Sequence, residues 1–383
     1  MKVLFVASDN NPSSGAFLSM VKLTSLLQDE FGVEIKVIVP REGEGVKLLE
    51  EKKISYELVR SFDWVIDNNT MSSGLKSVAR NCASVLTNPK AVRTLSKIIR
   101  DEGFDLVHLN TTYSHTGALA ALQAKVPFIW HLREMLEEDQ GRRLKNRELG
   151  YNLIGKADRI IAISSCVYDK YRALIPNGKL VKIFNGIDVE RFYTPGRSIM
   201  KDPKQFTLIY GGGYARRKGI YELASALNYL SLNNINNFRL LMIGEANQKY
   251  RDYLHKSGLD SKIRYLGYQK DVEQWYRQAD IAFSCSAMEA FGRKTIEAML
   301  CGCLMIGSNT GGNLDTIKDR ETGLLYEQGD PLSLAYTILY AMNHIDETKA
   351  LAKAGQEYAR QHFTAYDNAQ AVYEVYQDVL KNG

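Results

Sequence analysis

The chain has 383 residues, of which 45% are hydrophobic and 24% charged, a balance typical of a soluble globular protein with material for two domains of ordinary size. The apolar run directly after Lys2 is only five residues long, which is too short for a signal peptide. No stretch approaches eighteen uninterrupted apolar residues, so we expect no membrane-spanning helix either. The five cysteines lack paired zinc-type spacing and indicate reduced thiols. Composition therefore predicts a cytoplasmic protein.

Strand-like apolar runs alternate with amphipathic stretches along most of the chain. Before residue 200 the expected strands are 3–7, 35–39, 106–109, 128–130, 160–163 and 181–184. After residue 200 they are 206–210, 240–243, 263–266, 281–284 and 304–306. Repeated strand–helix alternation predicts an α/β protein with parallel, doubly wound sheets covered on both faces. The alternation pauses between about residues 186 and 205, around Pro195-Gly196, where we expect two domains to be joined.

The most informative feature for function is a pair of carboxylates eight residues apart, Glu289 and Glu297. The first is expected in a loop after the run 281–284 and the second inside the following helix. Carboxylates accept the hydrogen bonds that sugar hydroxyls donate, and a helix N-terminus favours phosphate. Eight helical residues would separate the two by roughly 12 Å, about the reach from a hexose to a ribose across a diphosphate. The segment predicts a nucleotide-sugar site, with a solvated helix face as the alternative.

The surrounding residues resemble the donor-site region of retaining glycosyltransferases of family 4, which have the GT-B fold. The motifs that carry the resemblance are, in chain order, Asn185-Gly186-Ile187-Asp188 with Phe192; Gly211 to Gly219; Ala290-Phe291-Gly292 with Thr295, Ala298, Met299 and Gly302; Gly311-Gly312; Thr322-Gly323-Leu324-Leu325; and Gly329-Asp330-Pro331. Each motif is weak, but their common order makes a strong joint signal.

The resemblance implies two doubly wound, Rossmann-like parallel-sheet domains that face each other across a cleft. Residues 1–187 would form the acceptor-side domain and residues 188–365 the donor-binding domain. A C-terminal helix over 366–383 would cross back to the first domain.

Roles for individual donor-site residues also follow from the resemblance. It places the sugar on Glu289 and on the backbone of Ala290, Phe291 and Gly292, beside Thr295. It places the ribose on Glu297 and the leaving diphosphate on Lys218.

At one position the chain departs from the family. An arginine usually stands five residues before the lysine, and here that position is Gly213. Arg216 or Arg217 would supply the missing guanidinium, or Gly213 would let backbone amides approach the phosphate.

In the first domain the resemblance points to Ser14, Gly15 and His131. Ser14-Gly15 occupies the place of a glycine pair near the donor phosphate, with an ordinary strand-to-helix turn as the alternative. His131 sits where the family has a histidine that reaches toward the donor sugar, with a satisfied structural histidine as the alternative. The run Trp130-His131-Leu132-Arg133-Glu134 resembles transferases that build bacterial surface or capsular polysaccharides.

No Asp-x-Asp, HExxH, Walker A or first-strand Gly-x-Gly-x-x-Gly motif occurs in the sequence. We therefore expect cations and helix dipoles, rather than a metal ion, to stabilise the leaving group. No cofactor and no nucleic-acid partner are expected. The co-substrate would be a nucleotide diphosphate sugar, with a UDP-sugar favoured over a GDP-sugar.

The resemblance, together with the missing metal motif, implies a retaining, metal-independent hexosyltransferase that acts on a glycan or lipid-linked acceptor in polysaccharide biosynthesis. Its expected catalytic residues are Glu289, His131 and Lys218. A GT-B epimerase or phosphorylase would share the sheets and the phosphate site, and a non-catalytic nucleotide-sugar-binding protein also stays open.

The net charge of +5 lies in the first half of the chain. Residues 1–200 hold 28 Lys and Arg against 23 Asp and Glu, whereas residues 201–383 hold 21 of each. Within the first half, four cations recur at helical spacing after Asn88-Pro89: Lys90, Arg93, Lys97 and Arg100. They predict a peripheral contact with anionic lipid on the inner face of the cell membrane, with a solvated helix face as the alternative.

Overall fold

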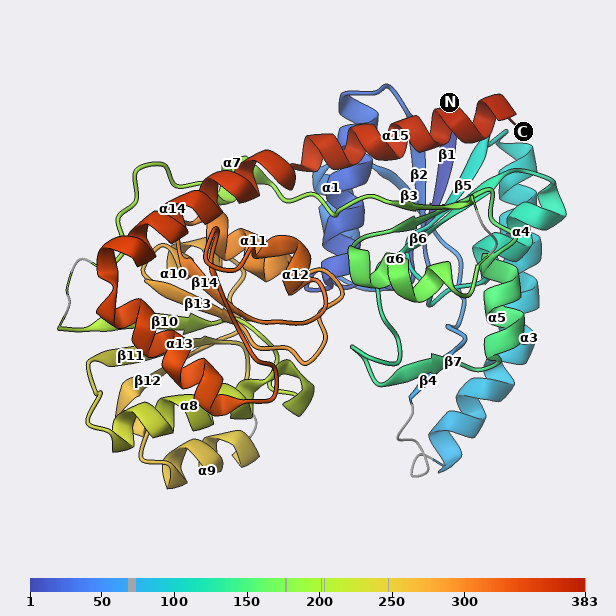
Figure 1. Ribbon diagram of the computed structural model, residues 1–383. Coiled ribbons are helices and arrows are strands. Elements are labelled where there is room, and N and C mark those ends of the chain that lie inside the picture. The colour runs from blue at the N-terminus through green and yellow to red at the C-terminus, as the bar shows by residue number, and fades with distance from the viewer. Residues whose placement is uncertain (68–73, 176–177, 201, 203, 247, 383) are drawn as a thin grey trace. The chain divides into compact units, whose positions relative to one another are not determined.

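The computed structural model describes residues 1–67, 74–175, 178–200, 202, 204–246 and 248–382, without the side chains of 74–84. The chain divides into two compact units (Figure 1). Unit 1 comprises Met1–Gly186 and Ala365–Gly383, and unit 2 comprises Ile187–Thr364.

Unit 1 is built on a parallel sheet that has seven strands within the described residues. Their spatial order is β3 (Ser55–Leu58), β2 (Glu34–Val39), β1 (Lys2–Val6), β5 (Leu106–Leu109), β6 (Phe128–Leu132), β8 (Arg159–Ala162) and β9 (Leu180–Lys182). The chain winds outward from β1 first on one side and then on the other, and the central strands β5 and β6 are wholly buried. A separate antiparallel pair joins β4 (Val65–Asp67) to β7 (Arg142–Leu144).

Helices flank this sheet, and the last of them comes from the C-terminus. In chain order they are α1 (Gly15–Asp29), α2 (Val46–Glu51), α3 (Gly74–Asp101), α4 (Thr116–Ala124), α5 (Arg147–Ile154), α6 (Ser165–Arg172) and α15 (Ala365–Asn382). The apolar face of α15 joins the unit 1 core through Val372, Tyr376 and Val379. The Asn368 side chain also donates a hydrogen bond of 2.6 Å to the Phe184 carbonyl, so α15 is an integral part of unit 1.

Unit 2 holds a parallel sheet with six strands among the described residues. Their order is β12 (Ile263–Gly267), β11 (Phe238–Ile243), β10 (Phe206–Tyr210), β13 (Ile281–Ser284), β14 (Leu304–Ser308) and β15 (Leu324–Tyr326). The accompanying helices are α7 (Val189–Phe192), α8 (Ile220–Leu232), α9 (Gln248–Lys256), α10 (Glu273–Tyr276), α11 (Arg293–Leu300), α12 (Asn313–Thr316), α13 (Pro331–Asn343) and α14 (Ile345–His362), with 3-10 turns η1 (Arg216–Lys218) and η2 (Asp260–Lys262). The winding reverses between β10 and β13, and this is where open α/β sheets bind ligands.

The two predicted parallel sheets are confirmed, and every expected strand run overlaps an observed strand. The strands β3, β4, β7 and β15 were not predicted, because they are only three or four residues long and lie at sheet edges or in the small antiparallel pair. Among the helices that the structure describes, none combines the length and the apolar composition that a membrane span requires.

Helix α3 extends beyond the predicted basic stretch, since it begins fifteen residues before Pro89 and contains that proline. Proline lacks the N–H that a helix interior uses and crowds the carbonyl four residues earlier, which here belongs to Val85. The Asn88 side chain binds both the N–H (2.8 Å) and the carbonyl (3.0 Å) of Phe62 and so fixes this part of α3 against the preceding loop.

Candidate functional site

A glycine-rich loop leaves β10 and passes through η1 into α8. The Tyr210 hydroxyl lies between the carbonyls of Gly213 (3.0 Å) and Lys218 (2.9 Å), which share its one proton, and so it links the two ends of the loop. Gly219 has φ +70°, and a Cβ there would lie 1.8 Å from the Cys285 carbonyl oxygen. Only glycine fits this position, so the backbone that carries Lys218 is held in one conformation.

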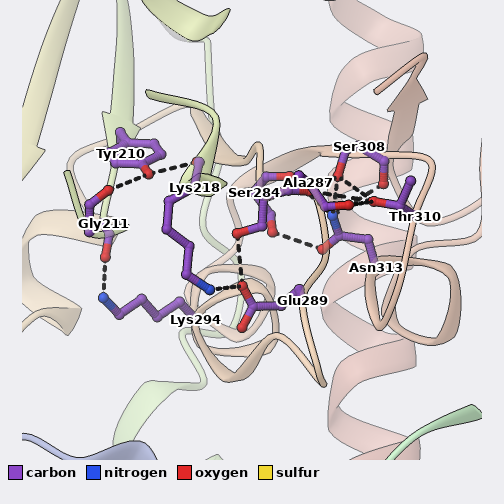
Figure 2. A network of polar contacts seen from close by, with 12 residues as sticks. Tyr210, Gly211, Lys218, Ser284, Ala287, Glu289, Lys294, Ser308, Thr310 and Asn313 are labelled. Carbon is purple, nitrogen blue, oxygen red and sulfur yellow. Dashed lines mark hydrogen bonds and ion pairs between the residues drawn. The ribbon is translucent and has the colours of Figure 1, made fainter. Parts of the chain in front are cut away.

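Lys218 forms an ion pair with Glu289, which lies in the loop after β13 (Figure 2). The Lys218 Nζ is 3.0 Å from the Glu289 Oε2, and the Ser286 hydroxyl donates to the same oxygen at 2.9 Å. The two paired side chains are 20% and 25% exposed. The pair is therefore partly shielded from water but still reachable by a ligand.

A second glycine segment, after β14, fixes the loop that carries Glu289. The Gly312 N–H donates to the Glu289 carbonyl at 2.7 Å. A Cβ on Gly311 would lie 2.6 Å from the same carbonyl oxygen, so a side chain at this position would displace the loop. The loops after β13 and β14 are thus held together by this hydrogen bond and by the close contact at Gly311.

Glu297 lies in α11, whose N-cap is Gly292, with φ +91°. It is buried and accepts a hydrogen bond of 3.3 Å from the Arg293 guanidinium, one turn earlier. Burial raises the pKa of Glu297, and the Arg293 charge opposes that rise. Residues 289–292 are not helical, so the separation expected from helix geometry does not apply. Thr295 is buried in the first turn, with its N–H 3.0 Å from the Gly292 carbonyl.

Lys294 is a further cation near this loop that no sequence motif indicated. Its ammonium donates to the Gly211 carbonyl at the start of the loop after β10, as Figure 2 shows. Partial removal from water lowers the pKa of Lys294, and the positive charge of Lys218 lowers it further, against the opposing effect of Glu297 and Glu289. The structure therefore brings a second lysine to the loop after β10, whose other end carries the Lys218–Glu289 pair.

The other residues predicted for the phosphate loop are exposed to solvent. Arg216 and Arg217 are exposed in η1, and the Arg217 carbonyl accepts from the Ala287 N–H at 2.9 Å. Gly213 is also exposed, and a Cβ there would meet no atom within 4 Å. No steric reason within the described residues requires glycine at 213.

In unit 1, Ser14 and Gly15 form the turn from the β1 loop into α1. The Ser14 hydroxyl oxygen accepts from the Phe17 N–H (3.4 Å) and donates to Asp9 (3.0 Å). Ser14 is thus the N-cap of α1, and exposed Gly15 is its first residue. Burial raises the pKa of Asp9, and its hydrogen bonds oppose that rise.

His131 lies inside β6 and is fully buried within a hydrogen-bonded cluster. Its Nδ1 is 3.2 Å from the Nε2 of His108 and 3.3 Å from a guanidinium nitrogen of Arg133. The Nδ1 of His108 is in turn 2.6 Å from the Tyr376 hydroxyl on α15. Burial and the Arg133 charge hold the pKa of both histidines well below the usual range, so both are neutral.

Arg133 and Glu134, which followed His131 in the sequence pattern, are both buried. Arg133 donates to the side-chain oxygens of Asn110 (2.9 Å) and Asn185. Glu134 accepts from the backbone N–H (2.5 Å) and the hydroxyl of Thr112. Burial raises the pKa of Glu134 to about 7, although the hydrogen bonds from Thr112 favour the ionised form.

The four cations of α3 project from one exposed face: Lys90, Arg93, Lys97 and Arg100. The opposite face is buried through Leu95 and Ile99. Just before these cations, Val85 and Leu86 are 70% and 71% exposed. The structure therefore places apolar side chains next to the basic face.

Two family models match the chain, one in each half. The Glycosyltransferase Family 4 model matches residues 28–191, and the Glycosyl transferases group 1 model matches residues 197–377. The chain belongs to the family 4 glycosyltransferases.

Individual relatives agree with this assignment. An uncharacterized glycosyltransferase of Methanocaldococcus jannaschii is 26% identical over 286 residues, which span 74% of this chain and 78% of that protein. The UDP-Gal:alpha-D-GlcNAc-diphosphoundecaprenol alpha-1,3-galactosyltransferase of Escherichia coli is 23% identical over 289 residues, which span 69% of this chain and 73% of that protein.

Solved structures share the GT-B fold. Anabaena HepE in complex with UDP and glucose superposes with a TM-score of 0.77 at 24% identity, over 98% of this chain and 99% of that one. WaaG, a glycosyltransferase involved in lipopolysaccharide biosynthesis, gives a TM-score of 0.69 at 15% identity, over 97% and 99% of the two chains.

Within this glycosyltransferase the predicted site residues fall into separate groups. In unit 2, Lys218, Glu289 and the start of α11 lie together, with Glu297 one turn into the helix. In unit 1, Ser14 and Gly15 start α1, while His131 lies in β6. The α3 cations form a group of their own on the surface.

Proposed function

We propose that this glycosyltransferase transfers a hexose from a nucleotide diphosphate sugar, preferably a UDP-sugar, to a hydroxyl of a glycan or lipid-linked acceptor, with retention of configuration and without a metal ion. The main support is the Lys218–Glu289 pair, which joins the loops after β10 and β13. These strands flank the position where the strand order of unit 2 reverses, the usual ligand site of open α/β sheets.

The leaving diphosphate would be held by lysines and by the first turn of α11. Lys218 and Lys294 bring two positive charges to the loop after β10, and Glu289 offsets one of them. The amides and dipole at the start of α11 add further positive potential. Lys294, rather than Arg216 or Arg217, then supplies the second cation.

The two carboxylates would bind opposite ends of the donor. Glu289 accepts hydrogen bonds from the sugar hydroxyls near the reacting carbon, beside the backbone of Ala290, Phe291 and Gly292. Glu297 accepts from the ribose hydroxyls. No enzymic nucleophile is assigned, because attack on the sugar from the face of the leaving phosphate needs orientation and charge stabilisation rather than a covalent intermediate.

The acceptor side of the proposal depends on unit 1. The basic face of α3, with exposed Val85 and Leu86 beside it, suits a peripheral contact with an anionic membrane. The E. coli relative carries a diphosphoundecaprenol acceptor in its name, which favours a lipid-linked acceptor and a role in polysaccharide biosynthesis for this chain as well.

A nucleotide panel followed by a turnover assay tests the function. We expect UDP to raise the melting temperature more than GDP, ADP or dTDP. With UDP-hexose, released UDP should increase when acceptor is added, and the new glycosidic linkage should keep the anomeric configuration of the donor in its NMR coupling constants. Binding without any UDP release would instead identify a nucleotide-sugar-binding protein, and interconversion of sugar epimers would identify an epimerase.

A further inference from the structure

A chain of hydrogen bonds links the C-terminal helix to His131 through the core of unit 1. Tyr376 on α15 contacts His108 on β5 (2.6 Å), and His108 contacts His131 on β6 (3.2 Å). The outer nitrogen of His131, Nε2, is buried and has no hydrogen-bond partner among the described residues. A buried polar nitrogen without a partner is destabilising, so a ligand oxygen at this position would gain a hydrogen bond that the protein does not provide.

The direction of each hydrogen bond follows from Arg133. A guanidinium can only donate, so the contact of 3.3 Å from Arg133 requires a lone pair on the Nδ1 of His131. His108 can then only donate from its Nε2 to the same atom, so the two donors share one lone pair, and the Nδ1 of His108 is left as an acceptor. Tyr376 completes the chain by donating its hydroxyl proton to that acceptor.

The surroundings support this assignment. Phe5 stacks on His108 with ring centroids 4.3 Å apart, so an apolar ring covers one face of this imidazole. Burial together with the Arg133 charge holds the pKa of both histidines well below the usual range, and burial raises the pKa of Tyr376 well above its usual value. All three groups are therefore uncharged, as the chain of donors and acceptors requires.

We propose that Tyr376 and His108 are positioning residues that hold His131 as the tautomer with its proton on Nε2, so that this atom offers a hydrogen-bond donor to a ligand oxygen and cannot act as a base. The role rests on the proposed transferase function, but the tautomer itself does not. With the opposite tautomer, Nδ1 would carry a proton facing Arg133 and His108, and Nε2 would present a lone pair. Tyr376 thus gives the C-terminal helix a part in the chemistry as well as in the core.

Imidazole NMR tests the tautomer without reference to activity. The chain has only six histidines, so selective 15N-histidine labelling gives a simple spectrum, and His131→Gln and His108→Gln assign two of them by loss of signal. We expect the wild-type His131 to show a protonated Nε2 and an unprotonated Nδ1 across pH 6 to 8. A protonated Nδ1 on His131 would overturn the proposal, whether or not the protein proves to be a transferase.

Substitutions test the positioning role. Tyr376→Phe removes only the donor hydroxyl, and we expect a mixture of His131 tautomers and a three- to tenfold lower kcat, the effect of one hydrogen bond, with KM for the donor little changed. Tyr171→Phe alters another buried tyrosine of unit 1, outside this cluster, and should change neither readout. At position 108, His108→Gln can still donate to His131 and should retain more activity than His108→Leu. If Tyr376→Phe keeps both the wild-type His131 tautomer and the wild-type kcat, the Tyr376 hydroxyl has no positioning role and the proposal is wrong.

Discussion

The ammonium of Lys218 lies 3.0 Å from a carboxylate oxygen of Glu289, so each of these side chains satisfies the charge of the other. A diphosphate that binds to Lys218 must compete with this carboxylate. The pairing therefore opposes nucleotide binding, even though both residues belong to the proposed donor site.

This competition predicts opposite effects for the two donor-site glutamates. Glu289→Gln removes the negative charge that pairs with Lys218, and we expect this variant to bind UDP about two- to fivefold more tightly, as suits a partly exposed ion pair, while it lowers kcat. Glu297→Gln should weaken donor binding and leave kcat closer to wild type, because ribose contacts are made equally in the ground and transition states. Calorimetry with UDP and steady-state kinetics measure both. Weaker UDP binding by Glu289→Gln would contradict the competition.

A set of single alanine variants separates the cations near the phosphate loop. Lys218→Ala and Lys294→Ala should each lower kcat/KM by tenfold or more, the effect of a lost charge-assisted hydrogen bond. Arg216→Ala and Arg217→Ala each remove one positive charge from η1 in the same loop, so they serve as matched controls and should lose less than threefold. If an arginine variant loses more than Lys294→Ala, the second cation has been assigned to the wrong residue.

Transfer should survive chelation. The proposal gives the leaving-group charge to lysines and to the start of α11, and the sequence has no Asp-x-Asp motif. We expect at least half of the rate to remain after exhaustive EDTA treatment, measured as UDP release with acceptor present. An activity that vanishes with EDTA and returns with manganese or magnesium would replace this account of the leaving group.

Anionic membranes should bind the α3 face at low salt. Each cation near an anionic surface contributes about 1 kcal/mol, so changing Lys90, Arg93, Lys97 and Arg100 together to Glu should release the protein from anionic vesicles. A matched control changes four exposed lysines scattered over the chain to Glu, namely Lys256, Lys270, Lys353 and Lys381. Co-sedimentation with anionic and neutral vesicles provides the measurement. Equal release by both quadruple variants would assign binding to net charge instead of to α3.

Glu134 should give unit 1 a pH-dependent stability. Burial raises its pKa from an ordinary value of 4.5 to about 7, so between these values the folded state holds a proton that the unfolded state has lost. The contribution of this group to the free energy of unfolding is therefore fully present below pH 4.5. It falls by at most about 3 kcal/mol as pH rises from there through 7. Glu134→Gln can still accept from Thr112 but cannot titrate, and it should flatten the change in unfolding free energy between pH 5 and 7. An unchanged slope would assign that dependence to other groups.

The sequence predicted those parts of the molecule that depend on local patterns. Continuous apolar runs such as Phe206 to Tyr210 identified the buried strands, and the spacing of Glu289 and Glu297 located the loop and helix after β13. Lys294 was missed because its contact with Gly211 joins residues 83 positions apart. The bond between His108 and Tyr376 spans 268 positions, and no pattern in the sequence could signal it.

The chain passes from unit 1 to unit 2 after residue 186 and returns to unit 1 at residue 365, and this order affects how the protein folds during its synthesis. Unit 2 is one continuous segment, Ile187–Thr364, whereas the core of unit 1 takes Val372, Tyr376 and Val379 from the last helix. During translation, all of the residues of unit 2 leave the ribosome before those of unit 1 are complete. The core of unit 1 therefore cannot close until residues 372–379 have been made, whereas unit 2 can fold before them.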